Sequence, residues 1–253
     1  MGKFVIALLI LVLTCGAAVA QSSHSLKTEP VSVSNVRSIH IDASVADIRF
    51  EKSENDMSWA ELVSEQSLVH YTLASAFSSD GGKLTYTLVY DESRTPLIYR
   101  ERVLTVYLPA KAYDELLLEL KVGNVGLRGF GASFDAASLI VDVGNVDFDN
   151  NGMIRNKLDL NVRVGRLNAT FEQLSFDCAF NVDVGDTQIN FLEPVRNADV
   201  NILSKIGDVH VPRSWPGTPS KFLIQSTYAA KHGDALHTLQ IKTEIGNITI
   251  TEK

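Results

Sequence analysis

A repeat of about twenty residues runs through the second half of the chain and constrains the fold more than any other feature. Six short strings follow one another: KVGNVGL, DVGNVDF, RVGRLNA, DVGDTQI, KIGDVHV and EIGNITI. Their glycines are Gly123, Gly144, Gly165, Gly185, Gly207 and Gly246, at separations of 21, 21, 20, 22 and 39 residues. A fixed period of this length is typical of a solenoid.

Two further segments extend the repeat with altered turns. The 39-residue gap spans about two periods, and the segment Phe222–Thr227 fits the template within it, with Thr227 in place of the glycine. Seven coils can therefore be counted from Leu118 to the C-terminus. The segment Ile41–Phe50 is a degenerate eighth copy, in which Ala46 replaces the glycine.

Each repeat contains two short strands of alternating apolar and polar residues around its turn, which is usually Gly-Asn or Gly-Asp. Gly tolerates positive φ, and Asn or Asp caps the bend with its side chain. Since no clear helix-length segment intervenes, we expect successive coils to pair in parallel and to wind right-handed. The sequence therefore predicts an all-β, single-chain parallel β-helix (β-solenoid) with coils of about 20 to 21 residues. A β-sandwich is the structural alternative.

The first half of the chain carries weaker strand signals. Residues 39–50 show period-two alternation in two stretches, and Leu84–Tyr90 and Val103–Leu108 behave similarly. The segment Trp59–Phe77 can be drawn as a helix or as two strands, and we interpret it as strands because its surroundings are β. Whether residues 51–110 form regular coils is left open by the pattern.

The phase of the repeat predicts which side chains point inward. Before the turn these are Leu139, Val141 and Val143; Leu160, Val162 and Val164; Phe180, Val182 and Val184; Ile202, Ser204 and Ile206; and Ile241, Thr243 and Ile245. After the turn they include Val125 and Leu127, Val146 and Phe148, Thr187 and Ile189, Val209 and Val211, and Ile248 and Ile250. Cys178 shares the inward parity, which predicts a buried and unreactive thiol.

The outward position just before the turn carries a ladder of charges. In chain order it is Lys121, Asp142, Arg163, Asp183, Lys205, Gln225 and Glu244. Parallel neighbours lie about 4.8 Å apart, so alternating charges would attract along the stack. The ladder supports the register, and it favours solvated ion pairs over a catalytic pair for Asp142 and Asp183.

The strings LTVYLPAKAYDELLLELKVGNVGLRG and LQIKTEIGNITI resemble a bacterial adhesin-like domain family of unknown function, which is related to auto-transporter adhesin heads. The resemblance covers residues 38–253. It implies a β-helical fold and an envelope location, and it implies no active-site residues because the motifs are structural. Ala46 and Thr227 depart from the turn glycines of the pattern.

The first twenty residues have the pattern of a secretion signal. Lys3 precedes the apolar run Phe4–Leu13, and Ala18-Val19-Ala20 is a small-x-small cleavage site. The apolar run is shorter than the roughly 20 residues that a retained membrane helix needs. We therefore expect a signal peptide over 1–20, a flexible leader over 21–37 and the solenoid over 38–253, with export to the periplasm or beyond. A lipid anchor on Cys15 is the alternative.

Charge and cysteine content exclude some classes of partner and of stabilisation. The chain has a net charge of −7, and removal of residues 1–20 leaves 22 basic against 30 acidic side chains, a net charge of −8. Nucleic acid is not expected as a partner, because binding to phosphates needs clustered Lys and Arg. The mature chain keeps one cysteine, so no intramolecular disulfide can form.

Three groups of residues are candidates for a functional site. Asp177 and Asp199 are expected to project outward from adjacent coils, where a pair of like charges could hold a cation or raise one pKa; ordinary surface carboxylates are the alternative. The Pro-rich loop 212–221 presents Arg213 and Trp215 either as a contact surface for an envelope ligand or with Trp215 folded back as a plug. His232, Asp234 and His237 could converge on a metal, but they lack a known metal-ligand spacing, so we expect them to be solvated loop residues.

The sequence thus favours a non-enzymatic, secreted or cell-envelope protein that presents an adhesin-like binding surface to an envelope protein or a polysaccharide. No catalytic residue, metal site or cofactor is predicted. The alternatives are a polysaccharide-active β-helix enzyme and a structural protein that self-associates through terminal coils, since Thr251-Glu252-Lys253 leaves the last coil almost without a cap.

Overall fold

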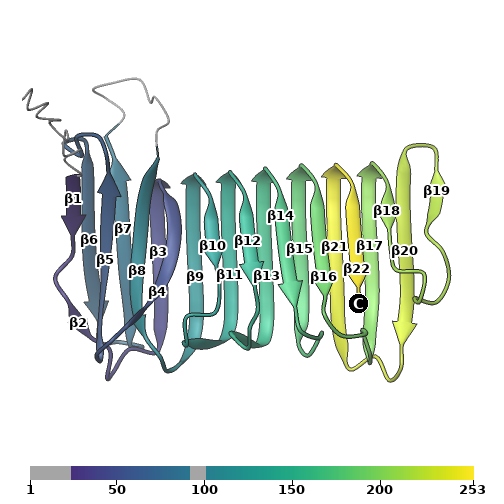
Figure 1. The fold of residues 1–253 in the computed structure, drawn as a ribbon, viewed down its shortest axis with the longest axis horizontal. Helices are drawn as coiled ribbons and strands as arrows, with labels where there is room; N and C mark the ends of the chain where they lie inside the picture. Colours follow the sequence, from purple (N-terminus) through teal and green to yellow (C-terminus); the bar gives the residue numbers. More distant parts are fainter. Residues whose placement is uncertain (1–23, 92–100) are drawn as a thin grey trace, which may run out of the picture.

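The computed structural model describes residues 24–91 and 101–253, and these form two large β-sheets that enclose one hydrophobic core (Figure 1). The predicted all-β class is confirmed. Within the described ranges no helix is long and apolar enough to cross a membrane. The predicted signal peptide, residues 1–20 with Cys15, lies outside the described residues.

Most of the described chain is wound into coils, each made of one strand in a first sheet followed by one strand in the second sheet. In chain order the coils are β3 (Ser38–Val45) with β4 (Asp47–Ser53), β7 (Lys83–Tyr90) with β8 (Arg102–Pro109), β9 (Ala112–Val122) with β10 (Val125–Leu127), β11 (Ser133–Val143) with β12 (Val146–Asp149), β13 (Ile154–Val164) with β14 (Leu167–Phe171), β15 (Asp177–Val184) with β16 (Thr187–Phe191), β17 (Ala198–Ile206) with β18 (Val209–His210), and β21 (His237–Ile245) with β22 (Ile248–Glu252). Neighbouring coils pair in parallel in both sheets.

The order of the coils in space differs from their order in the chain at both ends. The first sheet, which we call the long-strand sheet, runs β7-β3-β9-β11-β13-β15-β21-β17, and the short-strand sheet runs β8-β4-β10-β12-β14-β16-β22-β18. The last coil of the chain therefore lies between two earlier coils. The expectation that the C-terminal coil is an uncapped end is wrong, because β22 is paired on both edges.

Antiparallel strands cover the ends of the stack. At one end β5 (Met57–Ser64) pairs with β8, β1 (His24–Lys27) and β2 (Val31–Ser32) pair with β5, and β6 (Tyr71–Ser78) pairs with β7. At the other end β20 (Gln225–His232) pairs with β17, and β19 (Ser220–Phe222) pairs with β20. The outer edges of the coil strands β7, β8 and β17 are thus already paired, so no further coil can add at these three edges.

These end strands decide several of the sequence predictions. The interpretation of Trp59–Phe77 as strands is confirmed by β5 and β6. The prediction that Phe222–Thr227 is a coil is wrong: the segment runs from the end of β19 through a two-residue turn into β20, and Leu223 in the turn adopts a φ of 55°. The expected leader over 21–37 is structured from His24 onward, since β1 and β2 belong to the paired end strands.

The six predicted turn glycines are confirmed. Gly123, Gly144, Gly165, Gly185, Gly246 and Gly207 have φ values between 138° and 151°, a region that residues with a side chain rarely adopt. They also stack directly on one another: a Cβ built on Gly144 would lie 1.6 Å from the carbonyl oxygen of Gly123. The glycines are therefore required both by the backbone conformation and by the closeness of the coils.

The core is confirmed for most of the predicted inward residues, including Leu139, Leu160 and Phe180, which are almost fully buried. The residue just before each turn glycine is the exception. Val143, Val164, Val184, Ile206 and Ile245 were expected to point inward, and they are 43–48% exposed. Strict alternation fails there because the two sheets meet at the turn, so no interior space lies beneath that position.

Candidate binding groove

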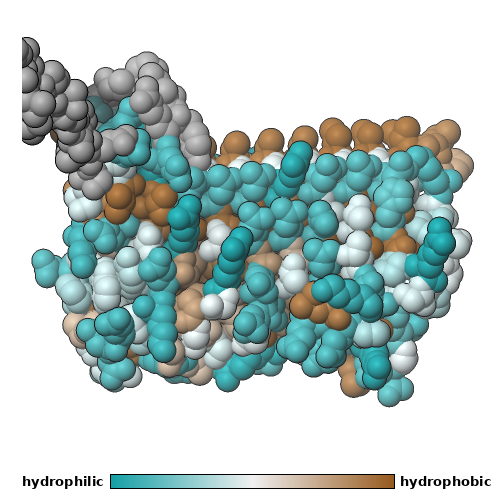
Figure 2. All heavy atoms as spheres, in the orientation of Figure 1, coloured by the Kyte–Doolittle hydropathy of each residue, from teal (hydrophilic) through white to brown (hydrophobic). Residues whose placement is uncertain are grey.

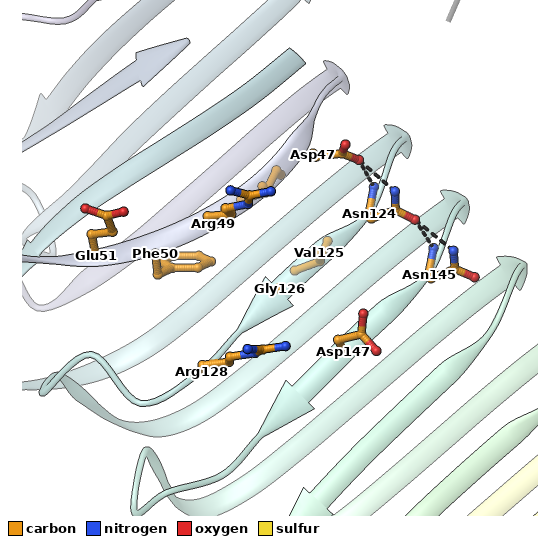
Figure 3. Close-up of a pocket in the computed structure, with 11 residues that line it drawn as sticks. Asp47, Arg49, Phe50, Glu51, Asn124, Val125, Gly126, Arg128, Asn145 and Asp147 are labelled. Carbon is orange, nitrogen blue, oxygen red and sulfur yellow. Dashed lines mark hydrogen bonds between the residues drawn. The ribbon is translucent and has the colours of Figure 1, made fainter. Parts of the chain in front are cut away.

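A groove of about 620 Å³ lies on the outer face of the short-strand sheet, over β4, β10 and β12 (Figure 3). Its floor is Gly126, whose Cα partners are Arg49 on β4 and Asp147 on β12. Because glycine has no side chain, the row of outward side chains is interrupted at this position. The groove is therefore a gap in the surface of a paired sheet.

One wall of the groove is a ladder of side chains at the turns. The backbone N and the Nδ2 atom of Asn124 both donate to Oδ1 of Asp47, at 2.8 Å each. In the same way the backbone N and Nδ2 of Asn145 donate to Oδ1 of Asn124, at 3.0 and 2.9 Å (Figure 3). Each residue thus fixes the next, so the wall is held in place by the fold itself.

The rest of the lining is charged. Arg49 and Glu51 project from β4, Arg128 follows β10, and Asp147 lies on β12 (Figure 3). Arg49 and Glu101 approach to 3.8 Å, but both side chains are mostly exposed, so this pair holds the guanidinium weakly. Two guanidinium groups therefore face the groove among carboxylates and amides.

A smaller hollow of about 180 Å³ shares Arg128 and Asp147 with the groove and extends it towards β14. Asn168 lines this hollow and donates from Nδ2 to Oδ1 of Asp147, at 2.8 Å. The two hollows together follow the direction in which the coils stack. Such a shape accommodates an extended ligand that crosses several strands.

The chemistry of the lining favours a polar ligand. Guanidinium groups bind carboxylates or phosphates through paired N–H donors, while amides and carboxylates exchange hydrogen bonds with hydroxyl groups. In residues 24–91 and 101–253 no group of three or more His, Cys, Asp or Glu residues is placed to hold a metal ion. The groove can thus recognise a chain of hydroxyl groups that carries some acidic substituents.

The predicted contact surface at Trp215 is wrong. Trp215 is only 4% exposed, and its ring packs against Phe191, Tyr228 and His232 with centroid separations of 6.4, 5.8 and 4.8 Å. The alternative reading, in which the indole folds back as a plug, is correct. Arg213 remains exposed beside it.

His232 is likewise part of this packing and is not a solvated loop residue, as had been expected from the sequence. Burial lowers the pKa of its imidazole, while the nearby Glu252 carboxylate acts in the opposite direction. His232, Asp234 and His237 are not brought together as a metal site.

The proposed pair of Asp177 and Asp199 does not exist. The two residues lie on β15 and β17, and β21 is inserted between these strands. Oδ1 of Asp177 instead accepts hydrogen bonds from the backbone N and Oγ1 of Thr238, at 2.8 and 3.0 Å. Asp199 accepts one from Asn201 at 3.1 Å. Each carboxylate is therefore satisfied separately.

The charge ladder is present in a different order, and the expected alternation fails at one step, where the carboxylates of Asp183 and Glu244 are neighbours. Its spatial sequence is Lys121, Asp142, Arg163, Asp183, Glu244 and Lys205, because the last coil of the chain is inserted before β17. Arg163 and Asp142 lie 3.5 Å apart, and Lys205 and Glu244 lie 2.6 Å apart. Gln225 is not a rung in a parallel coil, since β20 runs antiparallel.

Cys178 is buried, as its inward parity predicted. Burial raises the pKa of its thiol well above the ordinary value, and the carboxylates of Asp177 and Asp159 raise it further. The neutral thiol is a poor nucleophile. Its role is packing in the core.

The sequence reasoning missed the groove, although a signal was present. At the outward position of the strand after the turn, the other coils carry Arg49, Asp147, Asn168 and Gln188, whereas this coil carries Gly126. A glycine at a position where the neighbouring coils carry outward polar side chains leaves a gap in the surface. It could have identified the site before the structure was known.

The repeated coils and the glycine turns define a class: an all-β protein built from two large sheets. Residues 127–251 match the family model Toastrack DUF4097, so this part of the chain is a Toastrack domain. The match begins in β10 and includes the coils that follow. It is shorter than the range 38–253 expected from the resemblance, although the coils β3–β4 and β7–β8 continue the same pairing.

One solved structure shows the same fold, at a TM-score of 0.50. A provisionally named cell adhesion protein from Clostridium sporogenes is 12% identical, with a TM-score of 0.50 over 92% of this chain and 100% of that one. A provisionally named adhesin from Bacteroides fragilis is 14% identical (TM-score 0.33; 92% and 99% covered), and a provisionally named lipid binding protein from Parabacteroides distasonis is 12% identical (TM-score 0.28; 91% and 96% covered). The comparison with curated proteins finds no match.

Proposed function

We propose that this protein is a non-enzymatic, exported β-solenoid that binds a polysaccharide of the cell envelope in the groove above Gly126. The observation that carries the proposal is the pair of guanidinium groups, Arg49 and Arg128, beside a rigid ladder of amides in an open groove. Preformed polar sites on paired strands lose little conformational entropy on binding. The name of the Clostridium relative, a cell adhesion protein, agrees with an adhesin-like role.

The proposal includes a right-handed parallel winding of the coils and export after cleavage between Ala20 and Gln21. The parallel pairing of coil on coil supports the first, through the crossover rule. The sequence pattern of residues 1–20 supports the second. Mass spectrometry of protein purified from the native cell tests export: a mature N-terminus at Gln21 is expected, and an intact terminus or a lipid on Cys15 would contradict it.

Binding to a panel of neutral and acidic polysaccharides tests the groove. The double variant Arg49→Ala, Arg128→Ala should lose at least tenfold in affinity for the polysaccharide that binds, while its melting temperature stays within about 2 °C because both side chains are exposed. Arg213→Ala is the matched control, since Arg213 is an exposed arginine outside the groove. Equal loss in both variants would refute the site.

The same panel separates binding from catalysis. Product analysis of each polysaccharide after long incubation should show no new reducing ends and no unsaturated ends. If chain cleavage occurs and is lost in the double variant, the protein belongs to the polysaccharide-active enzymes, and the non-enzymatic proposal is wrong.

A further inference from the structure

A single file of exposed aliphatic side chains runs along the edge where the two sheets meet at the glycine turns. We call it the apolar ridge, and its residues in spatial order are Val143, Val164, Val184, Ile245 and Ile206. Figure 2 shows a continuous row of hydrophobic residues along this edge. The core and the groove do not account for it.

The ridge is long, straight and accessible. Its residues are 43–48% exposed, and at the spacing of paired strands the five of them span about 19 Å. It continues into the tip of the β19–β20 hairpin, Phe222 to Ile224, whose residues are 60–81% exposed. The backbone N of Gly207 donates to the carbonyl of Ile224 at 3.3 Å, which holds this tip at the end of the ridge. Contiguous exposed apolar surface marks an interaction site.

The row of charges beside the ridge is complementary to the same row on a second copy of the chain that runs in the opposite direction. Each ridge residue is preceded by one rung of the charge ladder, and in spatial order these rungs are Asp142, Arg163, Asp183, Glu244 and Lys205. A two-fold axis at the central rung places Arg163 opposite Glu244 of a second copy. The same axis places Asp142 opposite Lys205 of that copy. Asp183 lies on the axis, so it faces Asp183 of the second copy, and this is the one repulsive pair of the five.

We propose that the apolar ridge is the interface of a homodimer, in which two copies pack with antiparallel ridges about a two-fold axis at Val184. Val184 then meets Val184 of the second copy, and Val143 meets Ile206 of it. Every exposed ridge residue is covered in this register, and four of the five charge pairs across the interface are attractive. A parallel arrangement would lose this pairing, because the charge ladder would face the turn side chains.

The narrowness of the ridge also favours a second copy over a membrane. A stable interface buries about 800 Å² on each partner, so the ridge must be extended by its surroundings. In the dimer the charge ladder and the hairpin tip supply that extension, since the tip lies opposite Val122 of the second copy. Insertion into lipid would instead bring the charged rungs, one residue away, to the edge of the hydrocarbon, which is costly.

Cysteine crosslinking of the full mature chain tests the register. Val184→Cys should form a disulfide-linked dimer under mild oxidation with diamide, whereas Val143→Cys alone should not, because its two copies would lie about 19 Å apart, beyond the reach of a disulfide. A mixture of Val143→Cys and Ile206→Cys should crosslink. The native Cys178 is buried and does not interfere. Self-crosslinking of Val143→Cys at the rate of Val184→Cys would overturn the antiparallel dimer.

Sedimentation over a range of protein concentrations tests the interface itself. The wild-type chain should be dimeric at high concentration; Val164→Asp should weaken association at least tenfold, and Asp183→Asn should strengthen it several-fold by removing the repulsion on the axis. Val69→Asp is the control, since Val69 is 75% exposed and distant in sequence from the ridge. A wild-type chain that stays monomeric to millimolar concentration, or equal weakening by Val69→Asp, would overturn the proposal.

Discussion

The indole nitrogen of Trp215 donates a hydrogen bond to Oε1 of Glu252, 3.1 Å away. The same carboxylate accepts from the backbone N of Val195 at 2.6 Å and from Oγ of Ser214 at 2.8 Å. The loop that leaves the repeat after β18 is thereby tied to the last strand of the chain. This network stabilises the end of the stack where β18, a strand of two residues, would otherwise leave the core open.

Truncating the plug should therefore destabilise the protein. Trp215→Ala removes a buried aromatic side chain, and we expect a loss of about 3–5 kcal/mol in the free energy of unfolding, measured by urea denaturation. Arg213→Ala, two residues away and exposed, should change it by less than about 0.5 kcal/mol. A stable Trp215→Ala protein would show that the indole is not part of the core.

The Glu252 carboxylate should make stability depend on acidic pH. Burial acts to raise its pKa, but the hydrogen bonds from Val195, Ser214 and Trp215 outweigh this, so the folded-state pKa lies below the ordinary value of 4.5. A depressed pKa adds stability above the unfolded-state pKa, and this stability is lost as the pH falls through the folded-state pKa. Urea midpoints measured from pH 5 to pH 3 should therefore fall more steeply for the wild type than for Glu252→Gln.

His232 acts in the same direction at higher pH, because burial lowers the pKa of its imidazole below 6.5. His232 is present in both proteins, so the test between pH 5 and pH 3 is the difference between the wild-type and Glu252→Gln profiles and not the slope of either profile alone. Parallel pH profiles in that window would contradict the role assigned to Glu252.

The glycine turns should tolerate no side chain. Gly144→Ala places a Cβ 1.6 Å from the carbonyl oxygen of Gly123 and forces a φ of 149° on an alanine, so we expect a loss of at least about 3 kcal/mol or failure to fold. Gly126→Ala is the control, since nothing lies closer than 3.8 Å to its built Cβ. Thermal melts should show Gly126→Ala unchanged or slightly more stable. Similar losses in both variants would mean that stacking of the turns does not limit the spacing of the coils.

The charge ladder should contribute modestly. Arg163→Asp removes the 3.5 Å contact with Asp142 and creates a run of four neighbouring carboxylates from Asp142 to Glu244, which should cost about 0.2–1 kcal/mol for each rung affected. The second change Asp142→Lys should recover part of this loss. Urea midpoints are compared at a low protein concentration so that self-association does not contribute. A neutral single variant would show that the ladder is fully screened by solvent.

Prediction from sequence succeeded where the physics is local. The turn glycines follow from the backbone conformation that each turn needs, and the inward burial of Leu139 or Phe180 follows from the two-residue period of a strand. The same local rule misplaced Val143, because this last residue of β11 has the inward parity but lies where the two sheets meet, and no interior space remains beneath it. It also could not show that Gly126 leaves a groove, since a groove depends on what the neighbouring coils place around the gap.

The sequence by itself determined the coil: its period, its glycine turns, its alternating strands and the charges that flank them, all of which depend on residues close together in the chain. Only the tertiary structure decided the order in which coils lie side by side. Parallel coils of one pattern present nearly interchangeable edges, so the pattern cannot choose among them. The β19–β20 hairpin covers the outer edge of β17, and the last coil fills the position beside β15. That placement separates Asp177 from Asp199, joins Glu244 to Lys205, and buries Trp215 against the end of the core.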